Sequence, residues 1–396
     1  MSSSARRVLL YSHDACGLGH LRRQLTIAGA IAARSPGTAV LAATGVDDLG
    51  PFAVPDGVEL LKLPGLQKVA NDRYVARRLA LAPDATTQLR AGLLESAVSY
   101  FRPDLVLVDK HPLGASGELA PALGRLGAQG GRAVLGVRDV LDEPAVVASE
   151  WAASGLADAF DRYYDAGLVY GTPGLLDPVS EGGIPDVVLD RAHWCGHVAA
   201  PIADGQRPAD LPAGSRPLVV GCAGGGDDGA PLLRGFVAAS RGAPWRAIVV
   251  TGPLASRTDR HAIEAAARDA GVQVCRQVPD LRRWFRYADA LVCMGGYNML
   301  VEAAAAACPT VCVPRTRPRR EQLIRARAFA RCGLLTLVEP AGATPAALAR
   351  AVEESLALCR EGLGRRVAAM LDLRGAHQAA ETVEALAAPA VTAVAT

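Results

Sequence analysis

Short, continuously apolar stretches alternate with longer segments of helical composition along almost the whole chain. In the first half these stretches are residues 8–11, 39–42, 105–108 and 133–137. Apolar runs of this length, rich in β-branched residues and bounded by turn residues, are typical of strands that are buried on both faces of a parallel sheet. The helical segments between them supply the crossovers that parallel strands require.

The second half repeats this alternation, with apolar stretches at residues 218–221, 247–251, 272–275, 290–294, 310–313 and 335–338. Crossovers between parallel strands are right-handed in nearly all known cases. We therefore expect an α/β protein with two doubly wound, Rossmann-like parallel-sheet lobes. A length of 396 residues is sufficient for two such cores.

Residues 197–217 separate the two halves of the chain. This segment holds four prolines and two glycines and shows little apolar periodicity, which is the composition of a linker. We predict an N-terminal lobe over residues 1–198, a C-terminal lobe over 199–376, and a terminal helix and tail over 377–396.

The charge balance and the cysteines limit the class of protein. Lys and Arg number 42 against 40 Asp and Glu, so the chain has no overall field that would hold nucleic acid. Nine cysteines without a CxxC pair do not indicate a zinc ribbon or a disulfide scaffold. The sequence shows no signal-peptide pattern and no apolar run of about 18 residues. We expect a cytoplasmic protein, with the apolar residues at 61–66 and 79–81 as a possible peripheral contact with the inner membrane face.

A glycine-rich loop follows the first predicted strand and ends in a histidine, His13-Asp14-Ala15-Cys16-Gly17-Leu18-Gly19-His20. Its glycines allow a tight turn into a helix that is predicted to begin near residue 21, where unpaired N–H groups can bind a ligand. A dinucleotide-binding fingerprint requires a third glycine where Arg22 stands, which disfavours a nicotinamide dehydrogenase. His20 either faces a ligand at this edge of the sheet or is bonded to a backbone carbonyl.

A second loop, with three consecutive glycines, follows the first strand of the second half. Gly224, Gly225 and Gly226 are costly in conformational entropy unless the backbone approaches something closely. A phosphate group is a plausible reason, and a plain flexible turn is the alternative.

A third glycine turn, Gly295-Gly296, precedes a helix predicted over residues 299–307. Asn298 is placed to cap this helix, whose N-terminus suits a diphosphate. Glu302 lies one turn further and can reach back toward that end to accept bonds from two vicinal ribose hydroxyls. Alternatively, Glu302 is a glutamate that only stabilises the helix start.

Polar residues also follow the next predicted strand. Arg315 ends it, and Glu321 and Gln322 begin the next helix, where they suit sugar hydroxyls. Seven arginines lie between positions 315 and 331 without the interleaved aromatic residues typical of nucleic-acid binding. We predict a solvated helix face for most of them and single out Arg315 for a phosphate or a sugar.

Several of these segments together resemble the donor half of MurG-like glycosyltransferases, a family with the GT-B fold that is related to the peptidoglycan N-acetylglucosaminyltransferase. They are Tyr287-Ala288-Asp289-Ala290, Gly295-Gly296-Tyr297-Asn298, Glu302, Cys308-Pro309, Val313-Pro314-Arg315, Glu321-Gln322 and Arg331-Cys332-Gly333. In the first half, Gly17-Leu18-Gly19-His20 is similar to the N-terminal loop of that family. Three more segments look typical of a group of MurG-like predicted glycosyltransferases: Val108-Asp109-Lys110, Gly136-Val137-Arg138-Asp139 and Tyr170-Gly171-Thr172-Pro173.

The resemblance implies two lobes that face a cleft, with a nucleoside-diphosphate sugar in the C-terminal lobe and an acceptor in the N-terminal lobe. The default donor is UDP-linked N-acetylglucosamine, and the reaction inverts the anomeric centre without a cofactor or a metal. Gly295, Gly296 and Tyr297 would face the diphosphate, Glu302 the ribose, and backbone near Val278 the base. The residues expected to hold the donor are Gly19, Gly224, Gly225, Val278, Gly295, Gly296, Tyr297, Asn298, Glu302, Arg315, Glu321 and Gln322.

The chain departs from the family pattern at two places, which leaves the identity of the sugar open. Gly-Tyr-Asn stands at 296–298 where MurG has Ser-Gly-Ala, and Arg315 replaces a more apolar or aromatic residue. The acceptor, a small molecule or a lipid-linked sugar, is open as well.

Transfer of a sugar to a hydroxyl needs a base, and the pKa of histidine near neutrality suits that role. His20 is the first candidate and His13 the second, with Asp109 and Asp139 at strand ends as further candidates.

Two other readings of the sequence stay open. A UDP-sugar 2-epimerase of the same fold would use acids and bases around the sugar, for which Asp109, Glu118, Asp139 and Glu143 are available. A non-catalytic nucleotide-sugar-binding protein is the other alternative.

Overall fold

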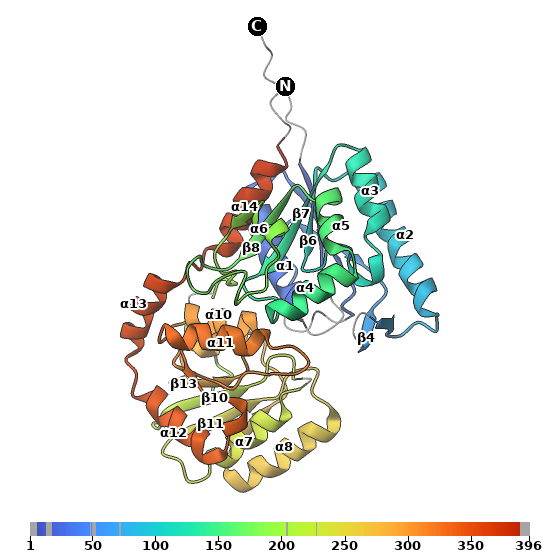
Figure 1. The fold of residues 1–396 in the computed structure, drawn as a ribbon. Coiled ribbons are helices and arrows are strands. Elements are labelled where there is room, and N and C mark those ends of the chain that lie inside the picture. The colour runs from blue at the N-terminus through green and yellow to red at the C-terminus, as the bar shows by residue number, and fades with distance from the viewer. Residues whose placement is uncertain are drawn as a thin grey trace.

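The computed structural model describes residues 6–12, 18–47, 49, 53–70, 73–202, 205–226 and 228–388, and the statements below concern these residues. It confirms the predicted architecture of two α/β lobes, each built on a parallel sheet. Figure 1 shows the N-terminal lobe above the C-terminal lobe, with helices α10 (Tyr297–Ala305) and α11 (Glu321–Arg331) between the two sheets.

The sheet of the N-terminal lobe has seven parallel strands in the order β3-β2-β1-β6-β7-β8-β9. Their bounds are β1 (Arg7–Tyr11), β2 (Ala39–Thr44), β3 (Val58–Lys62), β6 (Leu105–Asp109), β7 (Arg132–Arg138), β8 (Ala166–Tyr170) and β9 (Ala192–Trp194). β1 pairs with β2 on one side and with β6 on the other. The strand order therefore reverses between β1 and β6, which is where ligands bind in open α/β sheets.

Helices α1 to α6 cover this sheet, and an antiparallel hairpin extends from it. The bounds are α1 (Gly19–Arg34), α2 (Pro83–Phe101), α3 (Ala120–Ala128), α4 (Pro144–Ala153), α5 (Leu156–Tyr163), α6 (Asp186–Leu189), the 3₁₀ turn η1 (Ala115–Gly117), and the hairpin β4 (Leu66–Ala70) and β5 (Arg73–Ala76).

The sheet of the C-terminal lobe has six parallel strands in the order β12-β11-β10-β13-β14-β15. Their bounds are β10 (Leu218–Cys222), β11 (Arg246–Val250), β12 (Gln273–Cys275), β13 (Ala290–Cys293), β14 (Thr310–Cys312) and β15 (Thr336–Leu337). The other elements of this lobe are α7 (Ala230–Ala239), α8 (Arg257–Ala270), α9 (Leu281–Phe285), the 3₁₀ turn η2 (Pro340–Gly342), α12 (Pro345–Leu356) and α13 (Arg360–Met370).

Both faces of each sheet are covered, which explains why the strands are continuously apolar. In β1, Val8 and Leu10 belong to one buried cluster, and Leu9 and Tyr11 to the cluster on the opposite face. Burial of apolar surface contributes about 25 cal/mol per Å², so a strand buried on both sides has no place for alternating polar residues.

The last helix, α14 (Gly375–Leu386), returns to the N-terminal lobe and packs along α1 (Figure 1). Its small residues Ala379 and Ala380 are fully buried, which permits close packing of the two helices. At its polar edge, Glu384 accepts a hydrogen bond of 2.8 Å from Arg34. No helix in the described part of the chain is long and apolar enough to cross a lipid bilayer.

Candidate active site

His20 and Asp109 form a hydrogen-bonded pair at the carboxyl edge of the N-terminal sheet. Helix α1 begins at Gly19, two residues earlier than expected, so His20 lies in its first turn. Asp109 is the last residue of β6 and is fully buried. His20 Nδ1 and Asp109 Oδ2 are hydrogen-bonded to each other. The structure therefore brings together two of the predicted catalytic residues, whereas His13 lies outside the described residues.

The surroundings keep His20 neutral and Asp109 charged. Burial lowers the pKa of His20 to about 4, although the carboxylate of Asp109 acts in the opposite direction. For Asp109, burial acts to raise the pKa, but Arg23 and His20 outweigh it and hold that pKa well below its ordinary value. When the proton on Nδ1 is held by Asp109, the imidazole accepts a proton at Nε2. This is the arrangement of a histidine base with an orienting carboxylate.

Arg23 is a third member of this group that the sequence analysis missed. Its Nη2 lies 2.5 Å from Asp109 Oδ1 and 3.2 Å from His20 Nδ1. The guanidinium also lies over the rings of Tyr170 and Tyr297, at 5.4 and 5.5 Å from their centres. Residues three apart share one face of a helix, so the spacing of His20 and Arg23 was a usable sign.

A second buried ion pair lies between the lobes. Arg325 of α11 donates to Asp139, just after β7, with bonds of 2.7 and 2.9 Å to Oδ1 and 3.1 Å to Oδ2. Arg325 is fully buried, and Asp139 is 3% exposed. His197 Nε2 lies 3.4 Å from Asp139 Oδ2. Asp139 was one of the candidate bases, but its carboxylate is bonded to Arg325 of the C-terminal lobe.

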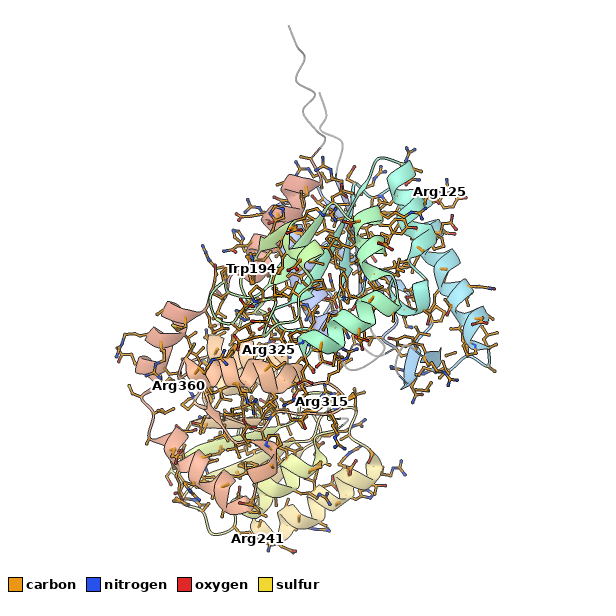
Figure 2. All side chains as sticks on the ribbon, in the orientation of Figure 1. Arg125, Trp194, Arg241, Arg315, Arg325 and Arg360 are labelled. Atoms are coloured by element: carbon orange, nitrogen blue, oxygen red, sulfur yellow. The ribbon has the colours of Figure 1, made fainter. Side chains whose placement is uncertain are left out.

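Arg317, Arg320, Arg327 and Arg331 are exposed, as predicted for most of the run, whereas Arg319 is half-buried and Arg325 is fully buried. Four arginines of this run pair with carboxylates of the N-terminal lobe: Arg319 with Asp142 and Glu150, Arg320 with Glu143, Arg325 with Asp139, and Arg331 with Glu181. Figure 2 shows Arg325 at the junction of the two lobes. No local pattern indicates the opposing carboxylates, because they lie more than 140 positions away along the chain.

Helix α10 begins at the glycine turn and is shared by both lobes. Gly296 is its N-cap residue, with no side-chain capping bond. The prediction that Asn298 caps this helix was therefore wrong, because Asn298 lies inside the first turn and donates a 3.0 Å bond to the carbonyl of Gly19. Gly295 has no room for a side chain, since a Cβ atom there would lie 2.8 Å from the carbonyl oxygen of Gln322.

The side chain of Tyr297 points into the junction of the lobes. It is 3% exposed and belongs to the apolar core of the N-terminal lobe. Its hydroxyl accepts a 2.8 Å bond from the backbone N–H of Val198, and the guanidinium of Arg325 lies 5.4 Å from its ring centre. A diphosphate at the start of α10 would therefore meet the backbone of Tyr297 and not its ring.

Glu302 is buried and paired across the lobes. Its Oε1 lies 2.7 Å from Nη2 of Arg22, on α1. Burial raises the pKa of Glu302 to about 7, although Arg22 acts in the opposite direction. Only 2% of Glu302 is exposed, yet it has a charged partner and does not lie among apolar groups alone.

The residues after β14 form a polar group around Arg315. Its guanidinium lies 2.9 Å from Asp228 and 2.8 Å from Glu321 Oε1, and its backbone N–H donates 3.1 Å to Gln322 Oε1. Figure 2 shows Arg315 on the C-terminal lobe, close to the junction. Two carboxylates already balance this guanidinium, which we had singled out for a phosphate or sugar.

The triple-glycine loop after β10 packs against a neighbouring turn. Gly224 has a φ of +60° and Gly226 a φ of +91°, in the region that glycine favours. The carbonyl of Gly225 accepts a 2.8 Å bond from Leu254. Val278, near the expected base site, is buried in the core of the same lobe.

The expected donor residues and the pair of His20 and Asp109 come from the carboxyl ends of strands in the two sheets. The glycine loops and Arg315 follow β10, β13 and β14, while Asp109 ends β6 and His20 lies in the first turn of α1, the helix after β1. The contact of Asn298 with Gly19 connects the two groups directly.

Two of the carboxylates considered for epimerase chemistry, Glu118 and Glu143, are already paired with arginine side chains. Glu118 is fully buried and accepts bonds of 2.5 Å from Tyr11 and 2.6 Å from Arg90. Glu143 is paired with Arg320. These two residues serve the packing of the chain, and they are not grouped around His20.

Comparison with solved structures identifies the architecture. The glycosyltransferase VinC, in complex with DTDP, superposes with a TM-score of 0.64 at 17% identity, over 96% of this chain and 99% of that one. MurG of Acinetobacter baumannii gives 0.59 at 14% identity, over 96% and 99%. The chain has the fold of the GT-B glycosyltransferases. UGT71G1 of Medicago truncatula, complexed with UDP-glucose, shares this fold with a TM-score of 0.62 at 12% identity, over 97% of this chain and 99% of that one.

Sequence comparison gives a shorter match. A UDP-N-acetylglucosamine--N-acetylmuramyl-(pentapeptide) pyrophosphoryl-undecaprenol N-acetylglucosamine transferase of Glaesserella parasuis serovar 5 (strain SH0165) is 30% identical over 80 residues. The match covers 20% of this chain and 23% of that transferase. No protein-family profile matches the chain.

Proposed function

We propose that this chain is a glycosyltransferase that moves a hexose from a nucleoside-diphosphate sugar to an acceptor hydroxyl with inversion. The observation that carries the proposal is the buried pair of His20 and Asp109, placed next to the start of α10 by the contact of Asn298 with Gly19. The GT-B fold and the similarity to a MurG-like transferase support the same reaction class.

In the proposed reaction His20 is the base. The acceptor oxygen attacks the anomeric carbon as its proton moves to Nε2 of His20, and the bond from that carbon to the diphosphate oxygen breaks. The electron pair of the broken bond leaves with the diphosphate. Asp109 stabilises the imidazolium that forms, as a buried carboxylate does for a histidine base.

The departing diphosphate needs positive stabilisation, which the start of α10 can supply. Its first N–H groups have no partner within the helix, and the positive end of the helix dipole lies there. The absence of a side chain at Gly295 and Gly296 lets a phosphate approach these groups. The proposed transfer requires no cofactor, and we assign it no metal.

The other donor contacts follow from the polar residues of the C-terminal lobe. We assign the ribose to Glu302, the sugar to Glu321 and Gln322, and the base to the backbone near Val278. UDP-N-acetylglucosamine is the first donor to test. The acceptor, either a small molecule or a lipid-linked sugar, would bind to the N-terminal lobe, and a lipid-linked acceptor would bring this lobe to the membrane surface.

Two experiments in sequence test the proposal. A thermal-shift panel of UDP, dTDP and their sugars identifies the donor, because a ligand at about 100 times its Kd stabilises a protein by about 2.7 kcal/mol. The bound donor is then incubated with and without a mixture of phenolic, sugar and lipid-linked acceptors. Release of UDP only with an acceptor supports transfer.

Other results would contradict it. Interconversion of two UDP-sugars without an acceptor would indicate the epimerase reaction. Tight UDP-sugar binding without turnover across the acceptors would indicate a binding protein. A His20→Ala variant with full turnover would remove His20 from the mechanism.

A further inference from the structure

Arg138, at the end of β7, is a half-buried cation that the proposed reaction does not use. It lies one residue before Asp139, and the charges of Arg325 and Glu321 from the C-terminal lobe act on it. Its Nε is buried without a hydrogen-bond acceptor, and no described carboxylate forms an ion pair with its guanidinium. Burial, followed by the nearby charge of Arg325, lowers the pKa of Arg138 to about 10, so the side chain is charged at neutral pH.

The neighbouring arginines differ from Arg138 in this respect. Arg23 is bonded to Asp109 and Arg325 to Asp139, and both pairs are buried. Because each of these carboxylates is already shared with a guanidinium, neither compensates Arg138 fully. A desolvated cation without a bonded partner costs free energy, so its presence requires an explanation.

Glu321, from the opposite lobe, interacts electrostatically with Arg138. Burial acts to raise the pKa of Glu321, and Arg138 is the strongest of the cations that lower it. Yet the two side chains are not bonded: Oε1 of Glu321 accepts from Arg315, and its Oε2 is buried without a hydrogen-bond partner. One donor atom of Arg138 and one acceptor atom of Glu321 are therefore left without a hydrogen-bond partner, although the two charges interact.

We infer that Arg138 binds an oxyanion, a carboxylate or a phosphate, carried by the substrate beside the reacting hydroxyl groups. A guanidinium forms paired, charge-assisted bonds with such groups, whereas a neutral sugar hydroxyl compensates its charge poorly. Glu321 accepts from a hydroxyl of the same ligand. This inference rests on the proposed glycosyl transfer and makes the substrate acidic.

The oxyanion belongs either to the donor sugar or to the acceptor. We do not assign it to the diphosphate, because Arg138 is part of the N-terminal lobe and the glycine turn before α10 is part of the other. The negative charge that acts most strongly on Arg138 is that of Glu321, which we have assigned to the sugar. A hexuronate, with a carboxylate and hydroxyls on one ring, fits both groups.

The donor arm of the test compares UDP-glucuronate with UDP-glucose by calorimetry. We expect the natural protein to bind UDP-glucuronate at least about tenfold more tightly, which corresponds to about 1.4 kcal/mol. Arg138→Met should reduce this preference to below about twofold and leave the Kd of UDP itself unchanged. Arg125→Met, at an arginine that is half exposed on α3, is the matched control and should keep the preference.

The acceptor arm uses 4-hydroxybenzoate and its methyl ester in the presence of UDP. A preference for the acid here, lost in Arg138→Met, would place the oxyanion on the acceptor. The inference is overturned if neither acidic probe is preferred, or if the preference survives in Arg138→Met. It is also overturned if that variant loses affinity for UDP, because Arg138 would then hold the diphosphate. If UDP and its sugars do not bind at all, the proposed function itself fails.

Thermal stability separates binding from a structural role. Removing a half-buried cation that has no bonded carboxylate should raise the Tm of the unliganded protein, so Arg138→Met should be more stable than the natural chain. A lower Tm would mean that Arg138 holds the fold together, which contradicts the inference. Arg138→Lys retains the positive charge but lacks the planar guanidinium that forms two parallel bonds with an oxyanion. This variant should keep a weaker preference for the acidic probe.

Discussion

The ion pair of Arg325 and Asp139 gives the sharpest prediction about stability. The guanidinium makes three bonds of 2.7 to 3.1 Å to the carboxylate and one of 3.2 Å to the carbonyl of Val140, with both side chains buried. Arg325→Met removes the cation and leaves the carboxylate in a dry site. Breaking one partner of a buried pair costs about 3–5 kcal/mol. We therefore expect a loss of that size in the free energy of unfolding.

The assay is urea denaturation followed by tryptophan fluorescence. Helix α11 supplies its own control in Arg327→Met, because Arg327 and its partner Glu339 are each 48% exposed and such pairs contribute about 0–1 kcal/mol. At a denaturant slope of about 3 kcal/mol per M, Arg325→Met should lower the urea midpoint by about 1 M or more. Equal effects of the two substitutions would refute the reasoning.

The pH dependence of this loss has a definite sign. Burial acts to raise the pKa of Asp139, but Arg325 and His197 hold it below its ordinary value of 3.8. Asp139 therefore stabilises the natural protein above pH 4, and this contribution is lost as the pH falls through the lowered pKa. In Arg325→Met the pKa of the buried Asp139 carboxyl rises. Protonation of this carboxyl at low pH then removes the cost of burying an unpaired negative charge. The difference between the two proteins should shrink from pH 7 to pH 3, and a constant difference would contradict this account.

Three further predictions concern single residues. His20→Ala should lower kcat with a UDP-sugar and acceptor by about 10²–10⁴-fold while leaving UDP affinity within about twofold, as measured by steady-state kinetics and calorimetry. Burial raises the pKa of Glu302 to about 7 from an ordinary 4.5, so the natural protein should lose up to about 3 kcal/mol of stability from pH 4.5 to 8, and denaturation curves of Glu302→Gln should lack this decline. Gly136→Ala would place a Cβ atom 2.1 Å from the hydroxyl of Tyr170, and should lower the unfolding free energy by about 1–3 kcal/mol, whereas Gly37→Ala, in open space, should not.

The apolar runs in the sequence predict the central strands. They do not reveal several strands that lie at a sheet edge or have only a short apolar run. β3 (Val58–Lys62) lies at one edge and carries Glu59 and Lys62, so it shows no continuous apolar run. β8 is buried throughout, but its sequence Ala-Gly-Leu-Val-Tyr offers only three large residues in succession. A continuous apolar run indicates a strand that is buried on both faces, so this pattern does not detect edge strands that are partly exposed to solvent.

The candidate site was predictable where a local pattern carries it and not where distant residues meet. The glycine turns were found because they follow predicted strands, and His20, Glu321 and Gln322 because they lie at the start of the helix after a predicted strand. Arg23 and Arg138 were missed as site residues, because their role depends on partners from other strands and from the opposite lobe. The burial of Arg325 within the arginine run was missed for the same reason.

Helix α10 connects ligand binding to the arrangement of the lobes. Its N-terminus is the proposed diphosphate site, while Tyr297 and Val301 on the same helix are buried in the core of the N-terminal lobe. Glu302 extends this connection through its pair with Arg22 on α1. Since the helix is rigid, a ligand that shifts its first turn must also shift these buried contacts. In the proposed reaction, the lobe that binds the donor sugar is therefore positioned by contacts with the lobe that carries the proposed base, His20.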